Sequence, residues 1–123
     1  MSKYYIDKTP IHIINECIIQ MQTDEEIEND LLEIKKMLYP KKFIIVSHYN
    51  SKLNGEYMYS RNKLINLLDI ICIKHNIPFI NPTNVLSNFT QNEVMIDDLG
   101  HYTDICINYF SNYINSFVNE SFK

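Results

Sequence analysis

The chain has 123 residues and a net charge of −4 at neutral pH, with a pI near 5.5. This length is enough to bury a core, and an acidic balance without a basic stripe argues against a nucleic-acid-binding protein. The three cysteines, Cys17, Cys72 and Cys106, are widely spaced and form no C-x-x-C motif. They predict buried, reduced thiols rather than a zinc ribbon or a redox pair.

No part of the sequence has the pattern of an export signal or a membrane span. The N-terminus lacks the apolar core of a signal peptide, and no apolar stretch approaches the length needed to cross a bilayer. We therefore expect a soluble, cytoplasmic protein that forms a single domain over residues 1–123.

The first predicted element spans residues 9–21, with the sequence TPIHIINECIIQM. Thr9 and Pro10 suit the first positions of a helix, and we predict a helix here. The run of β-branched residues that follows also permits a strand, so this alternative stays open.

The pattern over residues 23–40 predicts a second helix. Thr23 and Glu26 have the spacing of a capping box, and acidic residues fill the first turn, where they suit the helix dipole. Tyr39-Pro40 is expected to end the helix.

Two short apolar runs predict strands. Residues 43–46 (FIIV) form a continuous apolar segment, as in a strand that is buried on both faces of a parallel sheet. Residues 56–76 return to helical spacing, and residues 77–82 (IPFINP) predict a second strand. A polar stretch follows, and the amphipathic pattern over residues 103–117 predicts a terminal helix.

This alternation of helices and strands predicts an α/β fold, with a short parallel sheet and helices on both of its faces. Ligands of such sheets bind beyond the carboxyl ends of the strands. Two polar segments follow the predicted strands: SHYN at residues 47–50, and the long loop that contains MIDDLGHYTD at residues 95–104. A polar loop of this length is uncommon in a compact domain unless it has a function.

Asp98 and His101 stand three residues apart in that loop, on either side of Gly100. A carboxylate at this spacing can accept a hydrogen bond from the imidazole Nδ1–H, which leaves Nε2 available as a base. Gly100 permits a positive φ, so the turn can bring both side chains to one side. The alternative role for the aspartate is to cap the helix that follows.

In its context, this D-x-x-H spacing resembles the last sequence block of the SGNH (GDSL-like) hydrolase family. FIIVSHYN and YSRNKLINLLDIICIKHNIPFINP are similar to the penultimate strand, the helix and the final strand of that family, and the resemblance covers residues 23–118. It implies an incomplete, flavodoxin-like three-layer α/β/α sandwich that corresponds to the C-terminal part of such a hydrolase. It also implies an ester hydrolase that acts on substrates such as O-acyl groups of carbohydrates, with His101 as general base and Asp98 as its carboxylate.

The family's G-D-S-like turn with the nucleophilic serine has no counterpart in this sequence, and neither does the asparagine of its oxyanion hole. Ser47 is a substitute nucleophile if His101 comes within reach, and a hydrogen-bonding turn residue otherwise. His48 and Asn50 follow in the same turn, where they line a pocket or satisfy backbone groups at the strand end.

Arg61 is the only arginine of the chain. It is a candidate for binding a carboxylate of the substrate, and the alternative is a surface salt bridge with Asp98 or Glu56. His48, His101, Asp97 and Asp98 offer a further alternative, which is a metal site. Their spacing matches no metal-binding motif, so we predict neither a metal nor a cofactor.

Two convincing strands do not make a stable sheet. We therefore expect a second copy, a partner chain or another part of a longer gene product to complete it. The predicted function is hydrolysis of a small-molecule or carbohydrate ester, with neither nucleic acid nor membrane as a partner. The alternatives are a catalytically inactive relative that serves in binding or assembly, and a module that binds partners through the acidic helix at residues 23–38.

Overall fold

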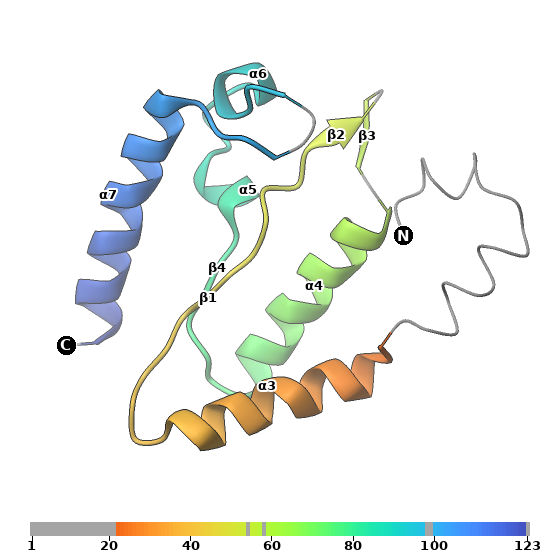
Figure 1. Ribbon diagram of the computed structural model, residues 1–123, viewed down its shortest axis with the longest axis vertical. Coiled ribbons are helices and arrows are strands. Elements are labelled where there is room, and N and C mark those ends of the chain that lie inside the picture. Colours follow the sequence, from red (N-terminus) through yellow and green to blue (C-terminus); the bar gives the residue numbers. More distant parts are fainter. Residues whose placement is uncertain (1–21, 54, 58, 98–99, 123) are drawn as a thin grey trace, which may run out of the picture.

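The described part of the chain consists of helices and very short strands (Figure 1). The computed structural model describes residues 22–53, 55–57, 59–97 and 100–122. The helices are α3 (Asp24–Leu38), α4 (Tyr59–Lys74), α5 (Pro82–Val85), α6 (Gln91–Val94) and α7 (Asp104–Ser121). The strands are β1 (Ile45–Val46), β2 (Lys52–Leu53), β3 (Glu56–Tyr57) and β4 (Phe79–Ile80).

The predicted parallel pair is formed by β1 and β4, with Ile45 opposite Phe79 and Val46 opposite Ile80. Helix α4 connects the two strands, as in a βαβ unit. Figure 1 shows α4 and α7 on opposite sides of this pair. The carboxyl ends of both strands point toward the end of the molecule that carries α5, α6 and the β2–β3 hairpin. The prediction of helices around a small parallel sheet is confirmed at this level.

Both predicted strands are present, but they are shorter and less buried than the sequence suggested. The expectation that residues 43–46 are buried on both faces is wrong, because Val46 is 43% exposed. Among the described residues, β1 pairs with β4 alone. The edge of β1 away from β4 thus has no neighbouring strand in the part of the chain that the structure describes.

Helix α3 begins as predicted. Thr23 Oγ1 accepts a hydrogen bond from the Glu26 N–H (3.1 Å), and the Glu26 carboxylate accepts one from the Thr23 N–H (3.3 Å). This helix contains no buried residue. Glu28, on the face toward α4, lies 3.0 Å from Lys74 Nζ.

The segment predicted as one helix over residues 56–76 divides into two elements. Its first residues belong to β3, which pairs with β2 in an antiparallel hairpin, and α4 begins only at Tyr59. Gly55 lies in the hairpin turn with a φ of +80°, a conformation that favours glycine. The hairpin was missed because each of its strands has only two residues, too few to show a period.

The polar stretch before α7 also contains two short helices that the sequence analysis took as loop. The Asn81 side chain accepts from the Thr83 N–H (3.1 Å) at the start of α5. Thr90 and Glu93 form a capping box at the start of α6. Both are side-chain caps of the type that starts a helix in a polar sequence.

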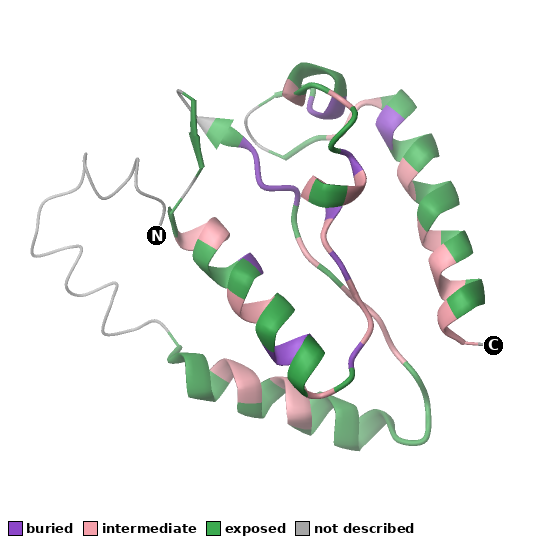
Figure 2. Ribbon diagram, turned by 180° about the vertical axis from the view of Figure 1, so that it is seen from behind, coloured by how far each residue is buried: buried purple, intermediate pink, exposed green. Residues whose placement is uncertain are grey.

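Buried side chains lie on α4, along the parallel pair and around the short helices (Figure 2), and one cluster of them joins the short helices to the start of α7. We call this cluster the α6–α7 core; it consists of Tyr49, Leu86, Val94, Met95 and Cys106. Cys72 and Cys106 are buried and free, as predicted. Cys17 and the element predicted over residues 9–21 lie outside the described residues. None of the described helices is both long and apolar enough to cross a lipid bilayer.

Candidate functional site

The polar turn after β1 lies at the carboxyl end of the parallel pair, where the fold predicts ligand binding. The Ser47 N–H donates to the Ile80 carbonyl (3.0 Å), which extends the strand pairing by one residue. The Ser47 hydroxyl donates to the His48 carbonyl (3.4 Å), and the His48 side chain is exposed. Ser47 is therefore engaged as a turn residue in this structure.

Asn50 is the centre of a buried polar network at the same strand end. Its side chain is 6% exposed, and its Nδ2 donates to Asn62 Oδ1 on α4 (2.9 Å). Its backbone N–H donates to Thr83 Oγ1, which follows β4 (2.7 Å). Asn50 thus ties both strand exits to α4, while its Oδ1 has no hydrogen-bond partner among the described residues. The side-chain hydrogen bond of Asn50 goes to another side chain and not to a backbone group, and both predicted roles of Asn50 stay predictions.

Arg61 lies beside this network in the first part of α4. Its Nη1 donates to the hydroxyl of Ser51 (3.1 Å), a residue that is 6% exposed. The side chain of Arg61 is partly exposed. The ion pairs seen among the described residues do not include the predicted alternative, a salt bridge of Arg61 with Glu56, and Asp98 lies outside those residues.

The loop between α6 and α7 folds back on itself. Met95 and Tyr102 form an antiparallel bridge, and the Ile96 N–H donates to the His101 carbonyl (2.8 Å). Gly100 has a φ of +100°, the positive φ that the sequence analysis expected of this glycine. Thr103 then caps α7, and its hydroxyl also donates to the Glu93 carbonyl (2.5 Å). The loop is therefore fixed at both of its ends.

Within this loop, His101 is paired with a carboxylate. His101 Nδ1 lies 2.6 Å from Asp97 Oδ2, and the His101 N–H lies 3.4 Å from Asp97 Oδ1. Since a carboxylate accepts hydrogen bonds only, this contact selects the tautomer with the proton on Nδ1. The side chains are 67% exposed for His101 and 38% for Asp97. The sequence analysis assigned the carboxylate to Asp98, and that assignment stays a prediction.

Tyr102 connects this loop to the turn after β1. Burial raises its pKa, a hydrogen bond with the Tyr49 backbone opposes the rise, and the nearby Arg61 charge also opposes it. Burial likewise raises the pKa of Tyr49. The Asp97–His101 loop and Arg61 therefore lie at the same end of the molecule, and Tyr102 is near both.

Residues 4–117 match the family described as the TviD N-terminal domain. The chain belongs to this family. The Vi polysaccharide biosynthesis protein TviD of Salmonella typhi is 31% identical over 91 residues, which cover 71% of this chain and 11% of that relative. The chain thus corresponds to a small part of the relative's length. No solved structure gives a significant match, and the resemblance to the SGNH hydrolases stays a prediction.

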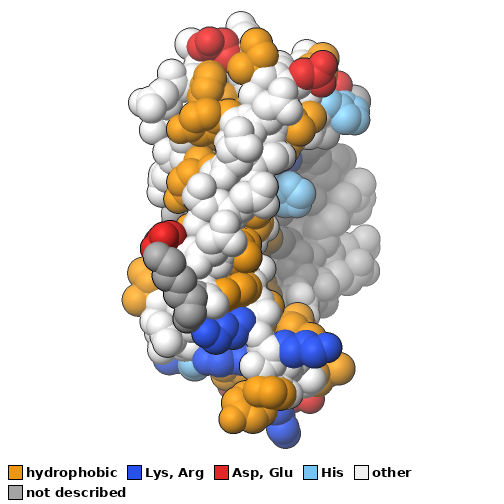
Figure 3. Space-filling view, turned by 90° about the vertical axis from the view of Figure 1, so that its left-hand side faces the viewer, with side chains coloured by type: hydrophobic (Ala, Val, Ile, Leu, Met, Phe, Trp, Pro, Cys, Tyr) orange, Lys and Arg blue, Asp and Glu red, His pale blue; other side chains and the backbone are white. Residues whose placement is uncertain are grey.

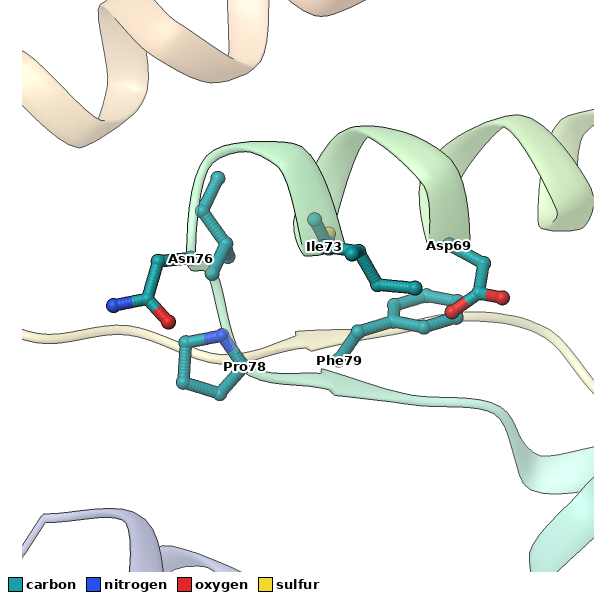
Figure 4. Close-up of a pocket in the computed structure, with 7 residues that line it drawn as sticks. Asp69, Ile73, Asn76, Pro78 and Phe79 are labelled. Atoms are coloured by element: carbon teal, nitrogen blue, oxygen red, sulfur yellow. The ribbon is translucent and has the colours of Figure 1, made fainter.

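An open groove of about 400 Å³ lies at the opposite end of β4 in this TviD N-terminal domain (Figure 4). It is formed by the end of α4 and the amino end of β4, and Figure 4 shows Asp69, Ile73, Asn76, Pro78 and Phe79 around it. None of the predicted site residues lines this groove. Among the described residues, no group of three or more histidine, cysteine or acidic side chains is arranged to hold a metal ion.

Three polar residues of the site were missed. Ser51 extends the polar run SHYN by one position, Asn62 directly follows the only arginine, and Tyr102 directly follows His101. Each of these three residues is adjacent in the sequence to a predicted site residue, and this position is the signal that could have identified it. Only the folded structure, however, shows which neighbours turn toward the site.

Proposed function

We propose that this TviD N-terminal domain supplies the acid–base pair of a site that processes carbohydrate esters, such as O-acyl groups. The observation that carries the proposal is the 2.6 Å contact between His101 Nδ1 and Asp97 Oδ2. In this arrangement Nε2 lies on the far side of the ring from the carboxylate, where a base is needed. The relative's name, a polysaccharide biosynthesis protein, supports a carbohydrate as the substrate.

The proposed chemistry uses His101 first as a base and then as an acid. Nε2 takes the proton of a hydroxyl while the oxygen of that hydroxyl attacks the acyl carbonyl. The carboxylate of Asp97 stabilises the imidazolium that forms. The C–O bond to the sugar then breaks, and Nε2 returns the proton to the departing sugar oxygen.

The nucleophile is the open part of this proposal. Ser47 is the candidate in the turn after β1, but its hydroxyl is bonded to the His48 carbonyl. We therefore favour a hydroxyl that comes from a partner chain, a second copy or another part of a longer protein. Such a partner would also complete the sheet beside β1. The finer SGNH-type fold is part of the same proposal.

The second candidate is a domain of this fold that is inactive and serves in binding or assembly. The exposure of the His101 side chain favours it, because a water-exposed pair gains less from electrostatic preorganisation than an enclosed one. The absence of a G-D-S-like turn from the sequence also favours it.

The two candidates are separated by the hydrolysis of p-nitrophenyl acetate and of an O-acetylated sugar, measured with the protein alone and again in the presence of the partner or longer protein that supplies the hydroxyl. If His101 is the base, His101→Ala lowers the rate about 10²–10⁴-fold. The exposed His48 is the matched control, and His48→Ala should leave the rate unchanged. A wild-type rate equal to that of His101→Ala would favour the inactive candidate.

The carboxylate is identified by two further variants in the same assay. Asp97→Asn should lower the rate strongly, because an asparagine can turn its amide toward Nδ1 and select the wrong tautomer. Asp98→Asn should have little effect. The reverse result would assign the role to Asp98, as the sequence alone predicts.

A further inference from the structure

Helix α3 has an apolar side that the described part of the chain leaves uncovered. The helix contains no buried residue, and Ile34 is 44% exposed, Leu38 38% and Met37 74%. In Figures 1 and 2, α3 lies at the lower end of the molecule, with the other described elements on one side of it. Most of the stability of a protein helix comes from the packing of its apolar face. We therefore expect a further surface to cover this side of α3.

The apolar residues of α3 have the spacing of a coiled coil. Ile27, Leu31, Ile34 and Leu38 follow one another at intervals of four, three and four residues. This is the spacing of the a and d positions of a heptad, where leucine and isoleucine pack into the holes of a second helix. The stripe formed by these four residues therefore fits a second helix as its partner.

The contacts of α3 with α4 occupy one flank of this stripe. Glu28 lies 3.0 Å from Lys74 Nζ, and Lys35 Nζ donates to the His75 carbonyl at 2.7 Å. Glu28 and Lys35 both have the e position of the heptad. The g positions, on the other flank, are occupied by Asp30 and Met37, which are exposed. A second helix can therefore approach the stripe from the g side without displacing α4.

The charges of α3 indicate which helix this is. All charged residues over 24–33 are acidic, whereas those over 35–42 are lysines. A second copy of α3 in the antiparallel orientation places its lysine end beside the acidic end of the first, and the two helix dipoles are opposed. A parallel copy would instead bring like charges together. The charge pattern of α3 is thus complementary to itself in one orientation.

We propose that α3 is the contact between two copies of this chain, which pair their α3 helices in the antiparallel orientation about a two-fold axis. Ile27 and Leu31 of each copy face Leu38 and Ile34 of the other. Each contact occurs twice, because a two-fold interface uses the same surface of both copies. The inference does not depend on the proposed function, since α3 contributes no residue to the candidate site.

Sedimentation equilibrium of the full chain at increasing concentration tests the contact. The wild type is expected to form a dimer that dissociates on dilution, because a helix of 15 residues is only about 22 Å long. Ile34→Gln should weaken the dimer about tenfold or more, since an apolar contact is lost twice. Ile105→Gln is the matched control, because Ile105 is an isoleucine of α7 that is 73% exposed. It should leave the dimer unchanged.

The orientation is tested at Met37 with two variants that lose the same apolar side chain. In the antiparallel pair, Met37 lies across from Asp30 of the second copy. Met37→Lys should therefore dimerise about fivefold or more tightly than Met37→Glu, and the difference should shrink in high salt. In a parallel pair each new charge would meet its own copy, and both variants would be weakened alike.

Circular dichroism shows whether each variant is folded, which is expected because the substituted side chains are exposed. A wild type that stays monomeric at every concentration would overturn the proposal and assign the cover of α3 to another partner or to another part of the chain. A dimer that a folded Ile34→Gln leaves intact would place the contact elsewhere. Equal dimerisation of Met37→Lys and Met37→Glu would refute the antiparallel orientation.

Discussion

The α6–α7 core and helix α3 are stabilised in different ways. Leu86, Val94 and Cys106 in the core are completely buried, whereas α3 has no buried residue. The contacts of α3 with the rest of the chain include the ion pair of Glu28 with Lys74. Exposed ion pairs contribute little to stability, while buried apolar side chains contribute most of it.

The more stable of these two regions is therefore the one that lies next to the candidate site. The loop with Asp97 and His101 begins and ends at residues of the α6–α7 core or next to it, such as Met95. The apolar residues of α3 are instead available to a further contact, and Met37 and Tyr39 at its end are exposed. The outward side of α7 carries apolar side chains as well, as Figure 3 shows. We infer that the site is supported locally, whereas α3 depends on what completes the sheet.

The largest expected effect comes from removing the same side chain in both regions. Leu86→Ala leaves a cavity in the α6–α7 core and should lower the free energy of unfolding by about 2–5 kcal/mol. Leu38→Ala, at a residue of α3 that is 38% exposed, should cost less than about 1 kcal/mol. Urea unfolding followed by circular dichroism measures both. Similar losses for the two variants would show that α3 is packed as tightly as the core.

A smaller difference is expected from the two threonine caps. Thr103 caps α7 and also donates to the Glu93 carbonyl, so Thr103→Ala should cost about 1–2 kcal/mol. Thr23 caps the exposed α3, and Thr23→Ala should cost about 0.5–1 kcal/mol. The same unfolding measurement compares them. An equal or greater loss for Thr23→Ala would contradict the assignment of α3 as the weaker region.

The sequence predicted elements well where one local signal was strong. The capping box of Thr23 and Glu26 placed the start of α3, and the apolar runs placed both strands of the parallel pair. The β2–β3 hairpin was not predicted, because its pairing depends on contacts across the turn and not on a period. The lengths of the strands depend on neighbours, which a local pattern does not contain.

The faces of the long helices were predicted less well than their positions. On α4, Leu64 is exposed while the neighbouring Ile65 is buried, a difference that helical spacing alone does not predict. Ile107 of α7 is also exposed, while the neighbouring Cys106 is buried. Both helices contain apolar residues on several sides, so the sequence does not determine which side meets the core.

The candidate site was predicted as a region rather than as a set of contacts. The loop with His101 and the turn with Asn50 lie at the expected strand ends. The contact of His101 with Asp97 depends on the backbone path through Gly100, and adjacent aspartates cannot be distinguished by spacing alone.

Alkaline pH should weaken the α6–α7 core more than the rest of the molecule. Burial raises the pKa of Tyr49 and Tyr102 above the ordinary value of 10.0, and that of Cys106 above 9.0. The folded state therefore holds these protons more tightly than the unfolded state. Their stabilising contribution is fully present below the ordinary values and is lost as the pH rises above them.

Urea unfolding at pH 8, 9, 10 and 11 measures this loss. Tyr102→Phe keeps the ring but removes the titrating hydroxyl, so the decline of its stability at alkaline pH should be shallower than in the wild type. Tyr39→Phe replaces an exposed tyrosine at the end of α3 and should follow the wild-type curve. If the slope were the same in all three proteins, Tyr102 would not contribute to the alkaline decline.

The smallest effect is expected from the ion pair that ties α3 to α4. The hydrogen bond from Lys74 lowers the pKa of Glu28, against a smaller opposing effect of burial. The stabilising contribution of Glu28 is therefore present above the ordinary value of 4.5 and is lost as the pH falls below it. Glu28→Gln should shift the urea midpoint at pH 7 by less than Thr23→Ala does, because the pair is accessible to solvent.

Salt and acid provide the checks on this ion pair. High salt screens an exposed pair, so the difference between Glu28→Gln and the wild type should shrink at 1 M NaCl, and it should also vanish at acid pH. Glu33→Gln, at an exposed position of the same helix, is the matched control. A midpoint shift for Glu28→Gln that is as large as that for Leu86→Ala, and that persists in salt, would show that α3 and the α6–α7 core unfold as one cooperative unit. The two regions would then differ in how far their side chains are exposed, but not in stability.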